Sequence, residues 1–124
     1  DDEAGLRRGR PGQRERWFSK IGTRWQLSAA LRNRVHFLQH NLMRPLPFAG
    51  VDVIFCRNVI IYYREDVVSR LMREFHAATC PGGYLFLGHS ESLYGVSEDF
   101  RLVHLPAATA YVRNDARHVA GGTP

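Results

Sequence analysis

The sequence predicts an α/β domain built around a strand, a helix and a second strand. Val51–Phe55 is short, rich in β-branched residues and preceded by Gly50, as expected of a strand buried on both faces. The apolar residues that follow recur at a spacing that places one apolar stripe on a helix, Asp66–Ala78. Tyr84–Leu87 is a second apolar run. A strand, a helix and a strand in this order form a right-handed crossover, so the two strands are predicted to be parallel neighbours.

Three parts are predicted before this unit. Residues 1–13 are polar and contain several glycines, which is typical of a flexible connector. Residues 14–33 are expected to contain a short hairpin, because aromatic and β-branched residues flank Gly22-Thr23 and favour pairing of 16–21 with 24–27. Val35–Leu38 alternates apolar with polar residues, and we interpret it as a strand with a polar terminus at Asn41.

The ends of the elements are also predicted. Asp66 is expected to cap the helix and Pro81-Gly82-Gly83 to stop it. Phe100–Leu105 and Thr109–Val112 are predicted to form an antiparallel hairpin that turns at Pro106-Ala107. Residues 34–113 would then form one larger folded part, followed by a flexible tail, residues 114–124.

Composition limits the class of protein. A hydrophobic share of 44% in 124 residues is typical of a globular domain, and no apolar run approaches the ~20 residues of a membrane span. Cys56 and Cys80 are too few for a disulfide framework, so we expect reduced thiols in a cytoplasmic protein. Nine of the seventeen Lys and Arg residues lie between Arg7 and Arg34, with Glu15 as the only acid there. This basic front half favours an acidic partner, or is a solvated surface.

Polar side chains follow both strands of the predicted crossover. Arg57 and Asn58 interrupt the apolar stretch VDVIFCRNVIIYY, and His89-Ser90-Glu91 follows the second strand. Since open α/β sheets bind ligands outside the carboxyl ends of their strands, these clusters predict a small-molecule crevice, which Asn41 would join if the earlier strand is parallel. The alternative is that Arg57 pairs with an acid, Asp52 or Glu91, and only caps a loop.

Three other chemistries are disfavoured. Residues 88–92, GHSES, imitate the hydrolase elbow G-x-S-x-G, but Ser92 replaces the second glycine and no strong helix pattern follows. Neither glycine-rich phosphate loop, G-x-G-x-x-G or G-x-x-x-x-G-K-[ST], occurs. No metal site is predicted, because no recognised metal spacing occurs among His36, His40, Cys56, His76, Cys80 and His89.

These motifs resemble a known family. VDVIFCRNVIIYY (51–63) and FHAATCPGGYLFLGHSES (75–92) closely resemble the C-terminal part of the catalytic domain of CheR-type chemoreceptor methyltransferases, protein-glutamate O-methyltransferases that use S-adenosylmethionine. RVHFLQHNL (34–42) is similar to the family's strand ending in Asn-Leu. Arg16-Trp17-Phe18 is similar to the start of the family's small β-subdomain, so the resemblance implies that residues 14–33 are a segment of that subdomain. The segment F-C-R-N-V-x-I-Y-Y is the most specific of these. The resemblance spans roughly Arg16 to Arg113.

The resemblance implies a fold and site residues. The fold would be a partial class I, Rossmann-like methyltransferase sheet from the strand order 3-2-1-4-5-7-6, with Val35–Leu38 as its third strand. Asn41 and Leu42 would border the adenine and ribose of S-adenosylmethionine, and Arg57 and Asn58 would bind its amino-acid part. Tyr62 would direct its hydroxyl toward the transferred methyl group and the incoming carboxylate, although Tyr62 as a core aromatic is the alternative.

The resemblance also implies partners. In the family the small β-subdomain adds an acidic-aromatic receptor tail as a strand, so we expect a chemoreceptor cytoplasmic region or an acidic receptor peptide as partner, with no membrane insertion. A basic set would favour such a peptide: Arg16, Lys20, Arg24 and Arg32. Two alternatives remain, namely a degenerate methyltransferase domain used as a sensor or scaffold and, less favoured, a nucleic-acid-binding module that uses its basic and aromatic residues.

Some family features have no counterpart here, namely the N-terminal helical domain, the glycine-rich first loop and the acid that holds the ribose. The chain alone is therefore expected to be inactive and to bind S-adenosylmethionine weakly or not at all. Strands one and two would also be missing, so a gap of roughly 14 Å is expected between Val35–Leu38 and Val51–Phe55. The second of these strands would then expose an apolar edge.

Overall fold

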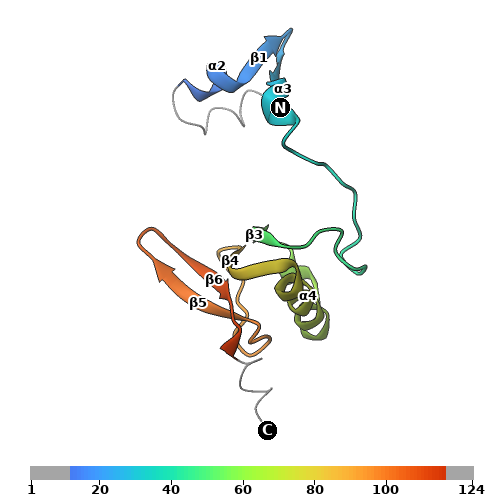
Figure 1. Ribbon diagram of the computed structural model, residues 1–124, viewed down its shortest axis with the longest axis vertical. Helices are drawn as coiled ribbons and strands as arrows, with labels where there is room; N and C mark the ends of the chain where they lie inside the picture. The colour runs from blue at the N-terminus through green and yellow to red at the C-terminus, as the bar shows by residue number, and fades with distance from the viewer. Residues whose placement is uncertain (1–11, 117–124) are drawn as a thin grey trace. The chain divides into compact units, whose positions relative to one another are not determined.

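A computed structural model describes residues 12–116 of the chain (Figure 1). It divides into two compact units, one ending at Gln39 and the other beginning at His40. The first unit holds α2 (Gln13–Trp17), β1 (Phe18–Ile21), β2 (Arg24–Leu27) and α3 (Ala29–Arg32). The second holds β3 (Val51–Cys56), the 3-10 turn η1 (Ile60–Tyr62), α4 (Glu65–Ala78), β4 (Thr79–Leu87), β5 (Phe100–Leu105) and β6 (Ala108–Arg113).

The first unit contains the predicted hairpin. β1 and β2 pair antiparallel from Phe18↔Leu27 to Ile21↔Arg24, and Gly22 turns the chain at a φ of 62°, which favours glycine. The prediction that the strand begins at Arg16 is wrong, because Arg16 and Trp17 belong to α2. The ladder ends at Phe18 since β2 stops at Leu27 and Ser28 leads into α3.

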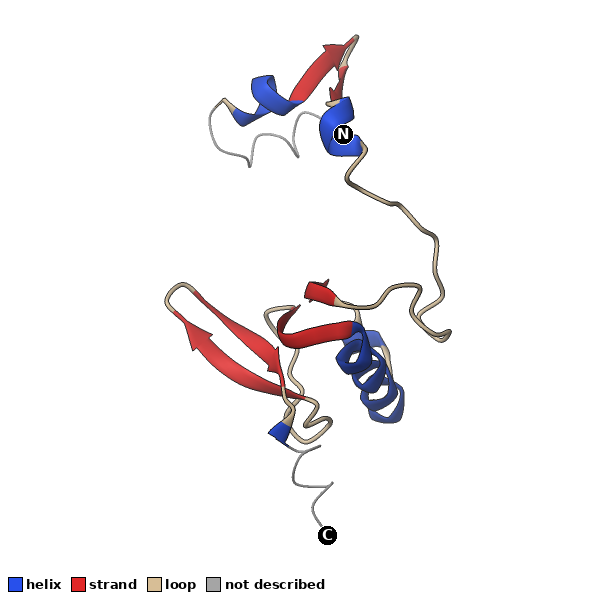
Figure 2. Ribbon diagram, in the orientation of Figure 1, coloured by secondary structure: helices blue, strands red, loops and turns tan. Residues whose placement is uncertain are grey.

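The second unit is a four-stranded mixed sheet in the order β3-β4-β6-β5 (Figure 2). β3 and β4 are parallel neighbours, as the crossover predicts, and β5 and β6 form the expected antiparallel hairpin. The predicted α/β fold class is confirmed, and the order equals the 4-5-7-6 portion of the class I arrangement.

The predicted ends of α4 need correction. The helix begins at Glu65 after Arg64, so Asp66 is not its cap; it lies in the first turn, where a carboxylate is favourable to the helix dipole. Pro81-Gly82-Gly83 does not stop the helix either, because β4 starts at Thr79 directly after Ala78. The glycines and the proline lie instead in a bulge: the pairs Val51↔Thr79 and Val53↔Tyr84 leave three extra residues on β4, where an unpaired Pro is tolerated.

The core lies between α4 and one face of the sheet. Ile54, Cys56 and Leu85 point to this face and pack with Leu71, Met72 and Phe75 of the helix, all of them buried. The prediction that Val51–Phe55 is buried on both faces is wrong. Val53 is 43% and Phe55 72% exposed, because no element of the described residues covers the second face.

The strand predicted at Val35–Leu38 is also absent. Residues 34–41 have no helix or strand, and the Phe37 side chain is 89% exposed. Alternation alone does not make a strand, since its N–H and C=O groups need a neighbouring chain, and no described strand pairs with this segment. The gap that was expected between Val35–Leu38 and β3 therefore cannot be defined, because Val35–Leu38 is not a strand.

The predicted connector and tail lie mostly outside the described residues. At their described ends, Gln13 belongs to α2, and Asn114 donates a side-chain hydrogen bond of 2.8 Å to the carbonyl of Glu98. Among residues 12–116, no helix combines the length and the apolar character that crossing a membrane requires.

Candidate functional site

The carboxyl ends of β3 and β4 meet at one edge of the sheet. Cys56 and Leu87 are register partners at the last pair of the parallel ladder. The residues that follow, Arg57-Asn58 after β3 and Gly88 to Glu91 after β4, are therefore adjacent. This is the edge at which open α/β sheets bind ligands.

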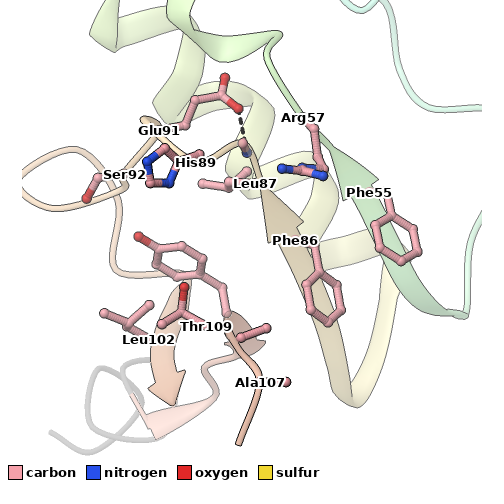
Figure 3. A pocket seen from close by; sticks show the side chains of 13 residues that line it. Phe55, Arg57, Phe86, Leu87, His89, Glu91, Ser92, Leu102, Ala107 and Thr109 are labelled. Atoms are coloured by element: carbon pink, nitrogen blue, oxygen red, sulfur yellow. Dashed lines mark hydrogen bonds between the residues drawn. The ribbon is translucent and has the colours of Figure 1, made fainter. Parts of the chain in front are cut away.

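A buried carboxylate joins the two strand ends. Glu91 is 9% exposed, and its Oε1 accepts hydrogen bonds from the backbone N–H groups of Asn58, at 2.6 Å, and Gly88, at 2.7 Å. Its Oε2 accepts from the N–H groups of Val59, at 3.0 Å, and Ile61, at 3.2 Å. Figure 3 shows Glu91 beside the end of β4 with its bond to Gly88. We call this arrangement the Glu91 clasp.

The clasp imposes conformations on its neighbours. Asn58 has a φ of 59°, and it is the one described residue other than glycine with a positive φ. Gly88 has no room for a side chain, because a Cβ there would lie 2.6 Å from Oε1 of Glu91, 2.9 Å from N of Asn58 and closer still to its Oδ1. The tight contact between the two loops thus requires glycine at position 88.

The clasp also sets the ionisation of nearby groups. Burial alone would raise the pKa of Glu91, but the hydrogen bonds from Asn58, Gly88, Ile61 and Val59 more than offset it, so the pKa of this carboxyl is lowered. Burial, with a smaller contribution from the Glu91 charge, raises the pKa of Cys56 to about 11. Cys56 is therefore a neutral thiol at physiological pH and a poor nucleophile.

A cavity of about 590 Å³ opens beside the clasp. The β4–β6 ladder ends at Leu85↔Tyr111, and beyond it the β5–β6 hairpin projects away from β4 (Figure 1). Side chains from β3, β4, the segments that follow them and the β5–β6 hairpin line the opening (Figure 3), among them Phe55, Arg57, Phe86, His89, Leu102 and Thr109. Its volume is typical of small-molecule sites, and it combines aromatic rings with a guanidinium and an imidazole.

The sequence-predicted site residues have different surroundings. Arg57 lines the cavity, whereas Asn58 is held in the clasp. Asn41 accepts a 2.9 Å hydrogen bond from the N–H of Met43 in an exposed turn, and Leu42 packs partly buried against the core. Tyr62 ends η1 and is 79% exposed. Neither Asn41 nor Tyr62 is among the residues that line the cavity.

The alternative interpretation of Arg57 finds no support. Asp52 accepts a hydrogen bond from the thiol of Cys80, and the Glu91 carboxylate is taken up by backbone N–H groups. Within residues 12–116, the structure gives Arg57 no ion pair. Its guanidinium faces the cavity edge instead.

Sequence reasoning placed Glu91 in the polar cluster but missed its role. The available signal was an acid three residues beyond a glycine that ends an apolar strand. Nothing in the sequence indicates that backbone groups 30 to 33 positions earlier would be its partners.

Comparison with known proteins identifies relatives of the chain. Residues 3–109 match the family described as "CheR methyltransferase, SAM binding domain". The chain is 36% identical over 113 residues to chemotaxis protein methyltransferase Cher2 of Pseudomonas putida, and 37% identical over 113 residues to chemotaxis protein methyltransferase 1 of Vibrio cholerae; each match covers 89% of the chain and 41% of the relative. It is 39% identical over 89 residues to an uncharacterized 104.1 kDa protein of Rhodobacter capsulatus, covering 72% of the chain and 9% of that protein. The chain thus spans about two fifths of the methyltransferases it matches.

Proposed function

The chain belongs to the CheR methyltransferase family, whose domain binds S-adenosylmethionine, and from that premise we propose that it forms the C-terminal part of an enzyme that methylates glutamate side chains of chemotaxis receptors. The observation that carries this proposal is the edge at which β3 and β4 end, where Arg57 and Asn58 lie against Gly88 and Glu91. The named methyltransferase relatives support the same reaction class.

The residues at this edge fit the cofactor. Gly88 leaves the two loops in close contact without a side chain between them, and Arg57 has no ion pair among the described residues. A free guanidinium and a nearby amide suit the carboxylate and amino group of an amino acid. Arg57 and Asn58 would hold that part of the cofactor, and Asn41 with Leu42 would border its nucleoside.

Tyr62 is proposed as the catalytic residue. When bound, S-adenosylmethionine supplies a methyl group that is already electrophilic on its sulfonium. A glutamate carboxylate is ionised at neutral pH, so the protein needs no general base. Orientation of the reactants can supply ~7–11 kcal/mol, and the Tyr62 hydroxyl would orient the incoming oxygen by donating a hydrogen bond. Its exposure supports access by a large protein substrate.

The first unit is proposed to bind an acidic receptor peptide. Cationic groups stack on its tryptophans: the Arg14 guanidinium lies 4.7 Å and the Lys20 ammonium 6.0 Å from the Trp25 ring centroid, and Arg16 lies 4.6 Å from that of Trp17. A peptide that adds a strand to the β1–β2 hairpin would meet these charges.

The proposal is tested by titrating the purified chain with S-adenosylhomocysteine while recording backbone amide NMR spectra. Selective shifts at Arg57, Asn58 and Gly88 are expected, even when the affinity is only millimolar. A matched titration with a single-stranded oligonucleotide at moderate salt serves as control. Response to the oligonucleotide alone would replace the methyltransferase assignment with nucleic-acid binding.

Catalytic roles are tested in the enzyme that contains the rest of the domain. Asn58→Ala is expected to weaken cofactor binding, whereas Tyr62→Phe should slow methyl transfer to a receptor fragment more than it weakens binding. Rates and affinities equal to those of the wild type in both variants would remove these residues from the mechanism.

A further inference from the structure

The Glu91 carboxylate touches the loops that follow two different strands. Oε1 bridges Asn58 of the first loop and Gly88 of the second, and Oε2 binds Val59 and Ile61. We propose that Glu91 is a positioning residue of the cofactor site, which holds the Arg57-Asn58 turn in its binding conformation without touching the cofactor. This inference rests on the proposed function, because it assigns the support of that same site.

The first argument is the backbone of Asn58. An L-residue at a φ of 59° is in the left-handed region, which costs free energy even though Asn tolerates it better than most residues. Such a conformation persists when its surroundings over-determine it. Here the N–H of Asn58 makes the shortest of the four bonds to Glu91, at 2.6 Å. The directions of the Arg57 and Asn58 side chains depend on this turn, so they depend on Glu91.

The second argument is the number and kind of donors. All four groups are backbone N–H groups, which cannot change rotamer, and bonds to an ionised acceptor are stronger than neutral ones. Four fixed donors around one carboxylate define its place to within a narrow range, and the carboxylate fixes them in turn. The clasp is thus a rigid brace between the ends of parallel strands β3 and β4.

The third argument is that a neutral amide cannot replace the carboxylate. Each carboxylate oxygen accepts two N–H bonds. In Glu91→Gln one of these oxygens becomes an NH₂ group, so either Asn58 and Gly88 or Val59 and Ile61 would face a donor. The variant keeps the volume and shape of the side chain and loses half of the clasp. The turn would then relax away from its present conformation.

The test compares Glu91→Gln with Glu98→Gln in the purified chain. Glu98 has an exposed side chain seven positions later, so the control makes the same change of charge outside the clasp. Two quantities are measured by amide NMR: the proton shifts of Asn58 and Gly88 without ligand, and the dissociation constant of S-adenosylhomocysteine. The shifts report the clasp itself, whether or not a ligand binds.

Glu91→Gln is expected to move the Asn58 and Gly88 amide signals upfield and to weaken binding by about tenfold or more, the scale typical of lost support for a binding residue. Glu98→Gln should leave the Asn58 and Gly88 amide signals in place. It should change the dissociation constant by less than about twofold, which is less than 0.5 kcal/mol. Glu91→Asp keeps the charge on a shorter side chain, and it replaces Glu91→Gln if the latter does not fold. It too should bind S-adenosylhomocysteine more weakly, and its Asn58 amide signal should also move upfield.

Two results would overturn the positioning role. If Glu91→Gln, or Glu91→Asp in its place, shifts the Asn58 and Gly88 amides yet binds S-adenosylhomocysteine as the wild type does, the proposed function stands and the role of Glu91 fails. If the Asn58 and Gly88 amide signals of Glu91→Gln, or of Glu91→Asp in its place, stay at their wild-type positions, the carboxylate does not hold the turn, and the positioning role fails while the proposed function stands.

Discussion

On one face of the four-stranded sheet, Ile54 and Leu85 are buried beneath α4; on the other, Phe55 is 72% exposed and its ring stacks on Phe86 at 5.1 Å between centroids. In sequence, both faces of β3 carry apolar residues, namely Val53 and Phe55 on the open face and Ile54 and Cys56 on the covered one. The difference teaches that an apolar run predicts a strand with two faces to bury. It does not predict which element covers each face. The described residues provide one such layer, α4, although parallel strands are usually covered on both faces.

The largest effect is expected on the covered face. Met72 is fully buried in α4, and Met72→Ala should lower the free energy of unfolding by about 2–5 kcal/mol, because it removes apolar contacts and leaves a cavity. Urea unfolding of the chain, followed by circular dichroism, measures this loss. A loss below 1 kcal/mol would contradict the assignment of the core to this face.

The reactivity of the Cys56 thiol should show whether the covered face is closed to solvent in the folded chain. With a pKa of about 11, Cys56 holds only about one thiolate per thousand molecules at pH 8, so alkylation should be on the order of a hundredfold slower than for an ordinary thiol, before burial slows it further. The rate is measured in Cys80→Ser, which leaves Cys56 as the single thiol. Unfolding in urea should restore the ordinary rate, and fast labelling of the folded chain would show that this face is open.

The Glu91 carboxylate, at the edge of the sheet, should make the free energy of unfolding depend on pH in the acid range. The folded-state pKa of Glu91 is lowered by its backbone hydrogen bonds despite burial, so its stabilisation is fully present above the unfolded pKa of about 4.3 and is lost as pH falls through the folded value. The difference in unfolding free energy between the wild type and Glu91→Gln should therefore shrink below this pH, by at most about 1.4 kcal/mol per unit. Parallel urea titrations at several pH values measure it, with Glu98→Gln as control. A constant difference would mean that Glu91 does not titrate in the clasp.

The smallest effect is expected on the open face. Phe55→Ala should cost about 1 kcal/mol or less, mainly from loss of the stacking on Phe86, because the ring is already largely in water. The same urea experiment used for Met72→Ala gives a direct ratio between the faces. Equal losses in the two variants would show that the open face is covered in solution.

Much of the fold could be predicted because its signals are local. The periodicity after Val51 identifies β3, α4 and β4, and the turn at Pro106-Ala107 identifies the hairpin that follows. The site was predicted in part: the positions of Arg57 and Asn58 after an apolar strand place them at a carboxyl edge, and the crossover brings Glu91 to the same edge. The roles of Asn41, Leu42, Arg57, Asn58 and Tyr62 stay predictions.

The sequence by itself determined what depends on neighbours along the chain, namely the helix period, the strand run and the specific motif F-C-R-N-V-x-I-Y-Y that indicates the family. The tertiary structure decided what depends on a partner far away in sequence. Val35–Leu38 has the pattern of a strand but no ladder beside it, whereas Pro81 and its glycines, which favour a stop, are tolerated as a bulge because β3 pairs on either side of them. The role of Glu91 belongs to this second class, since a carboxylate becomes a brace only where folding gathers backbone N–H groups that no pattern in the sequence records.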